Sequence, residues 1–266
     1  MSAIYEFGVQ RNARVVHGHI KAITHIILDR LWSLFGATYR SGPAMSAYGV
    51  QMVPNFGDMT FRYCYYATYG RYFSDYLDAI ETDFIFIDIG ANQGVFSLVA
   101  ARNPHCRRII AIEPVRLTFD LLEANIAING ASERSVLLNA ALSDHPGEAE
   151  IAFKANHSGR ASIAGHYQMR GRPTETIRLI DAAVLDVHIP QDLPIYVKID
   201  VEGHEEVVIA ELLKSAHAAR IKAIFHEVDE HWADAPAIRR MLVKGGFTRF
   251  RKFGIRRHYD VLAERA

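Results

Sequence analysis

One stretch of this 266-residue chain, "KIDVEGHE", places four ionisable side chains at alternate positions; these are Lys198, Asp200, Glu202 and His204. Alternate side chains of a strand share one face, so an unbroken strand would bring all four to the same side. Gly203 is expected to end the strand and to let His204 open a following helix. An imidazole titrates near ~6.5, which makes His204 the best general base for a hydroxyl proton. A structural histidine bonded to backbone at a helix start is the alternative.

Two carboxylates are further catalytic candidates. Asp200 lies in the same stretch, and Glu227 follows the later apolar run "IKAIFH". Asp200 could orient an acceptor or the amino group of a cofactor. Alternatively Asp200, Glu202 and Glu227 could gather a divalent ion such as Mg²⁺, which prefers hard oxygen ligands. We assign no metal site from the sequence, and Lys198 is expected simply to neutralise these acids.

A second stretch, "DIGANQG", has the features of a ligand-binding turn. Gly90 and Gly94 allow positive φ and let the backbone approach a ligand without an intervening Cβ. The helix beginning near Val95 offers free N–H groups and a positive dipole end to an anion. The dinucleotide fingerprint GxGxxG has a glycine where this chain has Asn92, so a pyrophosphate would meet a side chain there. Alone, such a loop could also be only a tight turn.

Glu113 adds a candidate for binding a ribose. It follows Gly94 by about 20 residues and ends the next strand-like run, where an acidic residue accepts hydrogen bonds from a ribose diol. A cofactor with a ribose but no pyrophosphate is therefore expected, and S-adenosylmethionine fits that description. A surface glutamate at a strand end is the structural alternative.

Regular patterns of strands and helices position these residues. Strand-like runs lie at 84–88, 108–112, 135–139, 195–199 and 221–225, and helical patterns lie at 95–102, 115–129 and 204–214. Apolar strands that alternate with helices predict a parallel sheet covered on both faces. Ligands of such sheets bind beyond the carboxyl ends of the strands. The polar residues at those ends are Asp88, Glu113, Asn139, Asp200, His226 and Glu227.

The remaining segments have weaker patterns. Residues 59–66 alternate for a few positions and predict a strand, and an irregular insert at 143–194 has an extra strand at 149–153. The runs "FTRFRK" and "HYDVLAE", joined through Gly254, predict an antiparallel hairpin at the sheet edge. Residues 20–35 have helical spacing, which predicts a helix packed on the domain or on a second subunit of a homodimer, with a membrane-surface or partner helix as the alternative. We expect an N-terminal extension over 1–80, which shapes the acceptor pocket or dimer contacts, and a catalytic domain over 81–266.

Composition excludes several classes of function. Thirty basic residues balance thirty acidic ones, so no overall field favours nucleic acid. Cys64 and Cys106 have no metal-type spacing and indicate reduced thiols in a cytoplasmic compartment. The first residues contain no apolar signal region, and no run approaches the ~18 apolar residues of a transmembrane segment.

Four motifs, "FIDIGANQG", "AIEP", "LLNAALSD" and above all "VKIDVEGHEEVVI", resemble the FkbM-type S-adenosylmethionine-dependent methyltransferases. The resemblance extends over roughly residues 56–230. It implies an α/β fold with a Rossmann-like class I methyltransferase sheet, mostly parallel with an antiparallel last strand. It also implies O-methylation of a hydroxyl on a sugar, a glycosylated compound or another small natural product.

The resemblance further implies which residues contact the cofactor. The methionine end would be lined by Asp88, Gly90, Asn92 and Gly94. Glu113 would hold the ribose, and Asn139, Ala140 and Ala141 would flank the adenine. "NHSGRAS" at 156–162 could reach the acceptor side.

Two other functions compete with methyl transfer. An NAD(P)-dependent oxidoreductase could use a Rossmann sheet, and a catalytically silent protein could bind the cofactor without turnover. The intact "DVEGHE" motif argues against the silent protein. The sequence contains no legible motif that identifies the acceptor.

Overall fold

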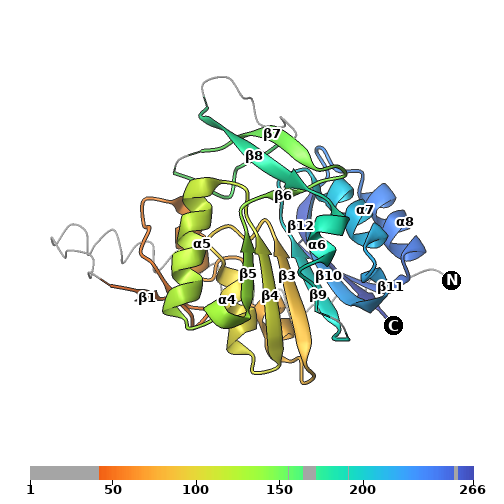
Figure 1. The fold of residues 1–266 in the computed structure, drawn as a ribbon, viewed down its shortest axis with the longest axis horizontal. Coiled ribbons are helices and arrows are strands. Elements are labelled where there is room, and N and C mark those ends of the chain that lie inside the picture. Colours follow the sequence, from red (N-terminus) through yellow and green to blue (C-terminus); the bar gives the residue numbers. More distant parts are fainter. Residues whose placement is uncertain (1–41, 155, 164–171, 191, 255–256) are drawn as a thin grey trace.

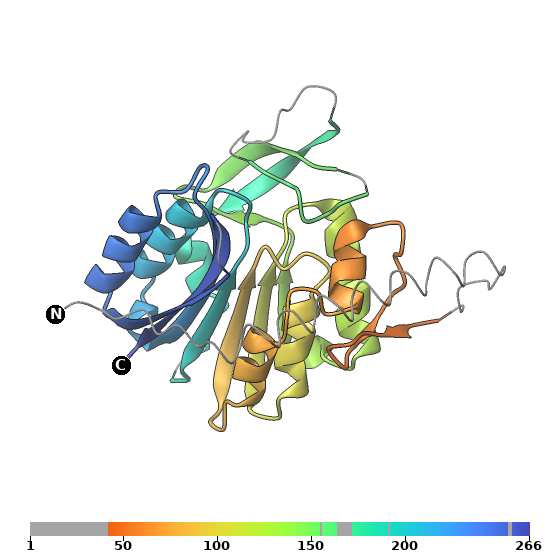
Figure 2. The same cartoon turned by 180° about the vertical axis from the view of Figure 1, so that it is seen from behind.

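The computed structural model describes residues 42–154, 156–163, 172–190, 192–254 and 257–266. The helix predicted at 20–35 lies outside this part of the chain. Figures 1 and 2 show a central sheet between helices, with a smaller sheet beyond one end of its strands.

The central sheet has seven strands in the order β11-β12-β10-β9-β3-β4-β5. Its strands are β3 (Phe84–Ile89), β4 (Cys106–Ile112), β5 (Ser135–Leu138), β9 (Ile195–Ile199), β10 (Ile221–Asp229), β11 (Phe247–Phe253) and β12 (His258–Arg265). Strands β5, β4, β3, β9 and β10 are mutually parallel, whereas β12 runs antiparallel to both β10 and β11. The predicted mostly parallel sheet and its antiparallel edge hairpin are therefore confirmed.

Helices cover both faces of this sheet, and its central strand β3 is buried along its whole length. The helices are α2 (Met59–Tyr65), α3 (Tyr72–Asp78), α4 (Val95–Arg102), α5 (Arg116–Ile128), α6 (Ala182–Asp186), α7 (Glu205–Lys214) and α8 (Ala235–Lys244), with 3₁₀ turns at Ser132–Arg134 and Ala218–Arg220. Helices α2 to α5 pack on one face, around Phe84 and Phe86. Helices α6 to α8 pack on the other, around Ile85 and Ile87. Alternate residues of β3 thus belong to two different cores.

The segment at 59–66 forms helix α2, so the predicted strand is wrong. The side chain of Asp58 accepts a hydrogen bond of 3.1 Å from the backbone N–H of Phe61 and caps the helix. Phe61 and Cys64, one turn apart, are both buried in the core. The short alternation in the sequence hides this helical spacing.

The insert after β5 builds a second sheet of three strands. These are β6 (Ala141–Leu142), β7 (Gly147–Ala152) and β8 (Thr174–Ile180), in the order β6-β8-β7. The predicted strand at 149–153 corresponds to β7, while β8 is not evident in the sequence. A hairpin of β1 (Ala44–Met45) and β2 (Gln51–Met52) precedes α2. Within the described ranges, no helix is both long and apolar enough to cross a membrane.

The buried His226 of β10 predicts a pH dependence of stability. The residue is 1% exposed, and burial lowers the pKa of its imidazole to about 4. The unfolded chain titrates near ~6.5, so this group stabilises the fold fully above that pH and its contribution is lost as the pH falls toward 4. We expect the free energy of unfolding, measured with urea, to fall by about 3 kcal/mol more in the wild type than in His226→Leu over this window. Parallel curves for the two proteins would contradict the expectation.

Candidate functional site

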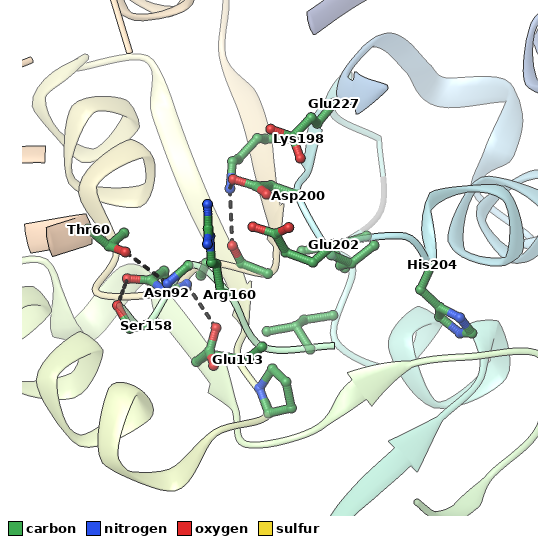
Figure 3. Close-up of a pocket in the computed structure, with 18 of the residues that line it drawn as sticks. Thr60, Asn92, Glu113, Ser158, Arg160, Lys198, Asp200, Glu202, His204 and Glu227 are labelled. Atoms are coloured by element: carbon green, nitrogen blue, oxygen red, sulfur yellow. Dashed lines mark hydrogen bonds and ion pairs between the residues drawn. The ribbon is translucent and has the colours of Figure 1, made fainter. Parts of the chain in front are cut away.

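A cavity of about 390 Å³ lies at the carboxyl ends of the parallel strands, and Figure 3 shows its lining. A volume of this order is typical of small-molecule sites. The residues of the predicted site that line it are Gly90, Asn92, Glu113, Ala140, Ala141, Asp200, His204 and Glu227. Segments that lie far apart in the sequence therefore meet at one rim, as the polar strand ends predict.

Three other residues of the predicted site, Asp88, Gly94 and Asn139, lie behind the residues that line the cavity. Asp88 is fully buried and accepts a hydrogen bond of 2.7 Å from Ser97 Oγ. Gly94 begins α4 with φ +85°, and Asn139 donates to the carbonyls of Glu113 and Pro114 at 2.9 Å. None of the three is among the lining residues. Their contacts support the residues that do line the cavity.

The sequence also predicts His226 at this rim, but His226 does not line the cavity. Its neighbour Glu227 lines the cavity, and successive side chains of a strand point to opposite faces. The Nδ1 atom of His226 lies 3.2 Å from the carbonyl oxygen of Glu227, and its Nε2 atom has no partner among the described residues.

Lys198 places a buried positive charge beneath the cavity. Its ammonium donates to the carbonyl of Gly90 at 3.0 Å and lies 3.4 Å from Asp200 and 3.6 Å from Asp88. Burial lowers the pKa of Lys198, but Asp200 and Asp88 outweigh that effect and raise it above its usual value. Lys198 is therefore charged, in agreement with the neutralising role expected from the sequence.

Glu113 lies beside residues 88–94, the glycine loop, and bonds to its backbone. Its two carboxylate oxygens accept backbone hydrogen bonds from Asn92 at 2.9 Å and from Val115 at 3.0 Å. Burial raises the pKa of Glu113 to about 7. A carboxylate has about four acceptor positions, so two remain for hydroxyl groups of a ligand. The residue thus fixes the loop and still offers acceptors to the cavity.

Three carboxylates lie close together at the other end of the cavity, where the sequence left a divalent metal ion as an alternative role for them. Oxygen atoms of Asp200, Glu202 and Glu227 lie within 4.8 Å of one another. Two of these acids already have cationic partners in the protein, because Lys198 pairs with Asp200 and His258 bonds to Glu227. These contacts favour compensation by protein side chains over a dedicated metal site.

His204 precedes α7, as the sequence predicts, and its ring is held by a side chain. Its Nε2 atom lies 3.3 Å from Ser143 Oγ, and Figure 3 shows the ring directed away from Asp200 and Glu202. Burial lowers the pKa of His204, which favours the neutral imidazole that a general base requires. The contact is with a side chain, whereas the structural alternative expected a bond to backbone, so the role of His204 stays a prediction.

A segment of the insert forms one wall of the cavity, and its contacts are not evident in the sequence. Residues 157–161 line it, in the stretch that the resemblance directs to the acceptor side. The backbone N–H of Ser158 donates to Asp58 at 3.0 Å, and that of Gly159 donates to Thr60 at 2.8 Å. Ser158 Oγ also donates to Asn92 at 3.1 Å. The only sign of these contacts in the sequence is Asp58, a residue type that commonly caps a helix.

The sheet order, with antiparallel β12 inserted between β10 and β11, is that of a Rossmann-like class I methyltransferase. A family model described as the methyltransferase FkbM domain matches residues 88–249, and the chain belongs to this family. The resemblance seen in the sequence is thereby confirmed.

Individual proteins show more distant similarity. Methyltransferase sdnD of Sordaria araneosa is 27% identical over 191 residues, which cover 60% of this chain and 72% of sdnD. The METTL16 MTase domain has a TM-score of 0.49 and 12% identity, covering 82% of this chain and 74% of that one. TrmK of M. capricolum, solved with S-adenosyl-homocysteine, has a TM-score of 0.44 and 14% identity, covering 73% and 66%. The family assignment rests on the domain match.

Gly90 yields a prediction for the loop. The residue has φ +72°, and an added Cβ would lie 1.9 Å from the carbonyl oxygen of Asp200. The first obstacle to a side chain here is therefore the protein's own backbone. Gly130 has a similar φ of +66° but open space around it. We expect Gly130→Ala to cost about 1–2 kcal/mol and Gly90→Ala clearly more, measured by urea unfolding. Equal losses would show that the loop can move away from Asp200.

Proposed function

We propose that this protein is an S-adenosylmethionine-dependent O-methyltransferase acting on a hydroxyl of a sugar, a glycosylated compound or another small natural product. The observation that carries this proposal is the division of one cavity into two ends. Glu113, Ala140 and Ala141 form an end suited to a nucleoside, and Asp200 and Glu227 form an end rich in hydrogen-bond acceptors.

The residues at the first end fit the proposed cofactor. Glu113 retains acceptor positions for a ribose diol, and the nearly buried Ala140 and Ala141 offer a small apolar surface to an adenine. Gly90 and Asn92 would bound the methionine part. When bound, the cofactor supplies a methyl group activated by a sulfonium. The side chain of Asn92 at the position of the fingerprint's middle glycine weighs against the NAD(P) alternative.

The protein's part in methyl transfer would be alignment and removal of a proton. Displacement at a methyl carbon requires the acceptor oxygen in line with the leaving group and a site that excludes water. We propose Asp200 and Glu227 as groups that accept hydrogen bonds from the acceptor. The pKa of the free side chain ranks His204 first as general base, but its ring points away from Asp200 and Glu202 (Figure 3), so we propose a carboxylate at that end instead. The free, buried Cys64 and Cys106 support the proposed cytoplasmic location.

Calorimetric titration with S-adenosylmethionine tests the cofactor assignment. We expect Glu113→Ala to weaken binding by about 1.5–3 kcal/mol, the scale of charge-assisted hydrogen bonds to the ribose. The variant also loses two bonds to backbone, so binding is measured below its unfolding transition.

Glu175→Ala provides the matched control. Glu175 accepts a hydrogen bond of 3.1 Å from the backbone N–H of Arg116 but does not line the cavity. Its loss should leave the dissociation constant unchanged. Tight binding of NAD(P) in place of S-adenosylmethionine would overturn the proposed function, and an unaffected Glu113→Ala would remove that residue from the ribose site.

The role of His204 can be tested by turnover. We expect His204→Ala to retain turnover within about 10-fold, measured as S-adenosylhomocysteine released with a panel of hydroxylated small molecules. A loss of 10²–10⁴, the usual contribution of acid–base catalysis, would instead make His204 the base. In the same assay, chelator and added Mg²⁺ should change neither wild type nor Asp200→Asn. A wild-type activity that needs Mg²⁺ would assign the three carboxylates to a metal.

A further inference from the structure

Three neighbouring strands place carboxylates side by side at one end of the sheet, and two of these acids line the cavity. Asp200 directly follows β9, Glu227 lies on β10, and Asp260 lies on β12. Glu227 and Asp260 are opposite one another in the antiparallel pair, so their side chains share a face. Three acids so close together need positive or donating partners.

Each acid in the row has its own partner, and the three partners differ in access. Lys198 pairs with Asp200 from below the cavity and is 4% exposed. The hydroxyl of Tyr72 donates to Asp260 in the core. His258 Nε2 bonds to an oxygen of Glu227, and the side chains of this pair are 60% and 22% exposed. Both His258 and Glu227 line the cavity, whereas Tyr72 and Asp260 do not.

We propose that His258 is the positioning residue of the reaction, which holds Glu227 ionised and leaves its second oxygen free to take the proton of the acceptor hydroxyl. The inference rests on the proposed function. As the acceptor oxygen bonds to the methyl carbon, the carbon–sulfur bond breaks and its electron pair stays on sulfur. The sulfonium charge is lost and the Glu227 carboxylate gains the proton, so atoms and charge balance.

The electrostatic surroundings support Glu227 in this role. Burial and the neighbouring Asp200 raise the pKa of Glu227 to about 7, while the bond from His258 lowers it. A base with a pKa near the working pH is the most effective. The charged groups around Glu227 are Asp200 after β9, Asp260 and His258 on β12, and Glu202, an oxygen of which lies within 4.8 Å of one of Glu227. The imidazole of His258 faces three acids, Glu227, Asp229 and Asp260, and its bond to Glu227 raises the pKa of His258 to about 9.

NMR titration of the 266-residue chain tests the pair without an acceptor or cofactor. The expected pKa of His258 is about 9 in the wild type, with a fall of at least one unit in Glu227→Gln. In His258→Ala the pKa of Glu227 should rise, and in His258→Gln, whose amide can still donate a hydrogen bond, it should rise less. A His258 that titrates near ~6.5 and ignores Glu227→Gln would overturn the proposal. A fall in the pKa of His258 on adding Mg²⁺, which would show that the metal displaces His258 from Glu227, would also overturn the proposal.

Turnover of S-adenosylmethionine with a monosaccharide panel gives the second readout. His258→Ala should lower kcat by roughly 10–100-fold with little change in cofactor affinity, and His258→Gln should recover part of it. His231→Ala is the matched control, because His231 pairs with Asp229 nearby but does not line the cavity. Equal rates for His258→Ala and His258→Gln would refute positioning by hydrogen bonding. If no monosaccharide reacts, the NMR titration decides, and cofactor titration separately tests the proposed function.

Discussion

The buried ammonium of Lys198 is the charge on which the geometry of the site depends. Burying a lysine costs several kcal/mol unless other groups compensate its charge. Compensation comes from Asp88 on β3, from Asp200 after β9 and from the carbonyl of Gly90. One ion therefore fixes the glycine loop and the carboxyl end of β9 relative to each other. The close approach of Gly90 to the backbone of Asp200 belongs to the same arrangement, and it leaves no space for a Cβ.

The far wall of the cavity depends on individual hydrogen bonds, one of them to the carboxylate of Asp58. The 157–161 segment reaches the glycine loop through Ser158 and Asn92, and Asp58 and Thr60 hold it from the other side. A neutral bond of this kind contributes only about 1 kcal/mol net, and the bond to a carboxylate about 1.5–3 kcal/mol. The cavity thus combines a rigid floor of buried charges with a wall held by several modest hydrogen bonds. Local opening of the wall should cost far less free energy than disruption of the floor.

Much of this arrangement is legible in the sequence because parallel strands are buried on both faces. Such strands appear as apolar runs, and the polar residue that follows each run marks the rim. The helix at 59–65 escaped detection because its tyrosines and Arg62 imitate strand alternation, while Asp58 caps it. His258 could not be placed from local pattern at all. It reaches the rim only because β12 enters the sheet between β10 and β11 and sets His258 opposite Asp229.

Charge compensation also explains how an acidic cavity end could serve a neutral acceptor. A row of free carboxylates would attract cations and repel one another. With Lys198 paired to Asp200 and His258 bonded to Glu227, two of the acids that line the cavity instead present acceptor oxygens whose charge is partly compensated. Oxygens of this kind accept hydrogen bonds from several hydroxyl groups at once, which fits the proposed polyhydroxylated acceptor. The same compensation leaves Glu227 with a pKa near neutral pH, because His258 offsets part of the desolvation that would otherwise raise it further.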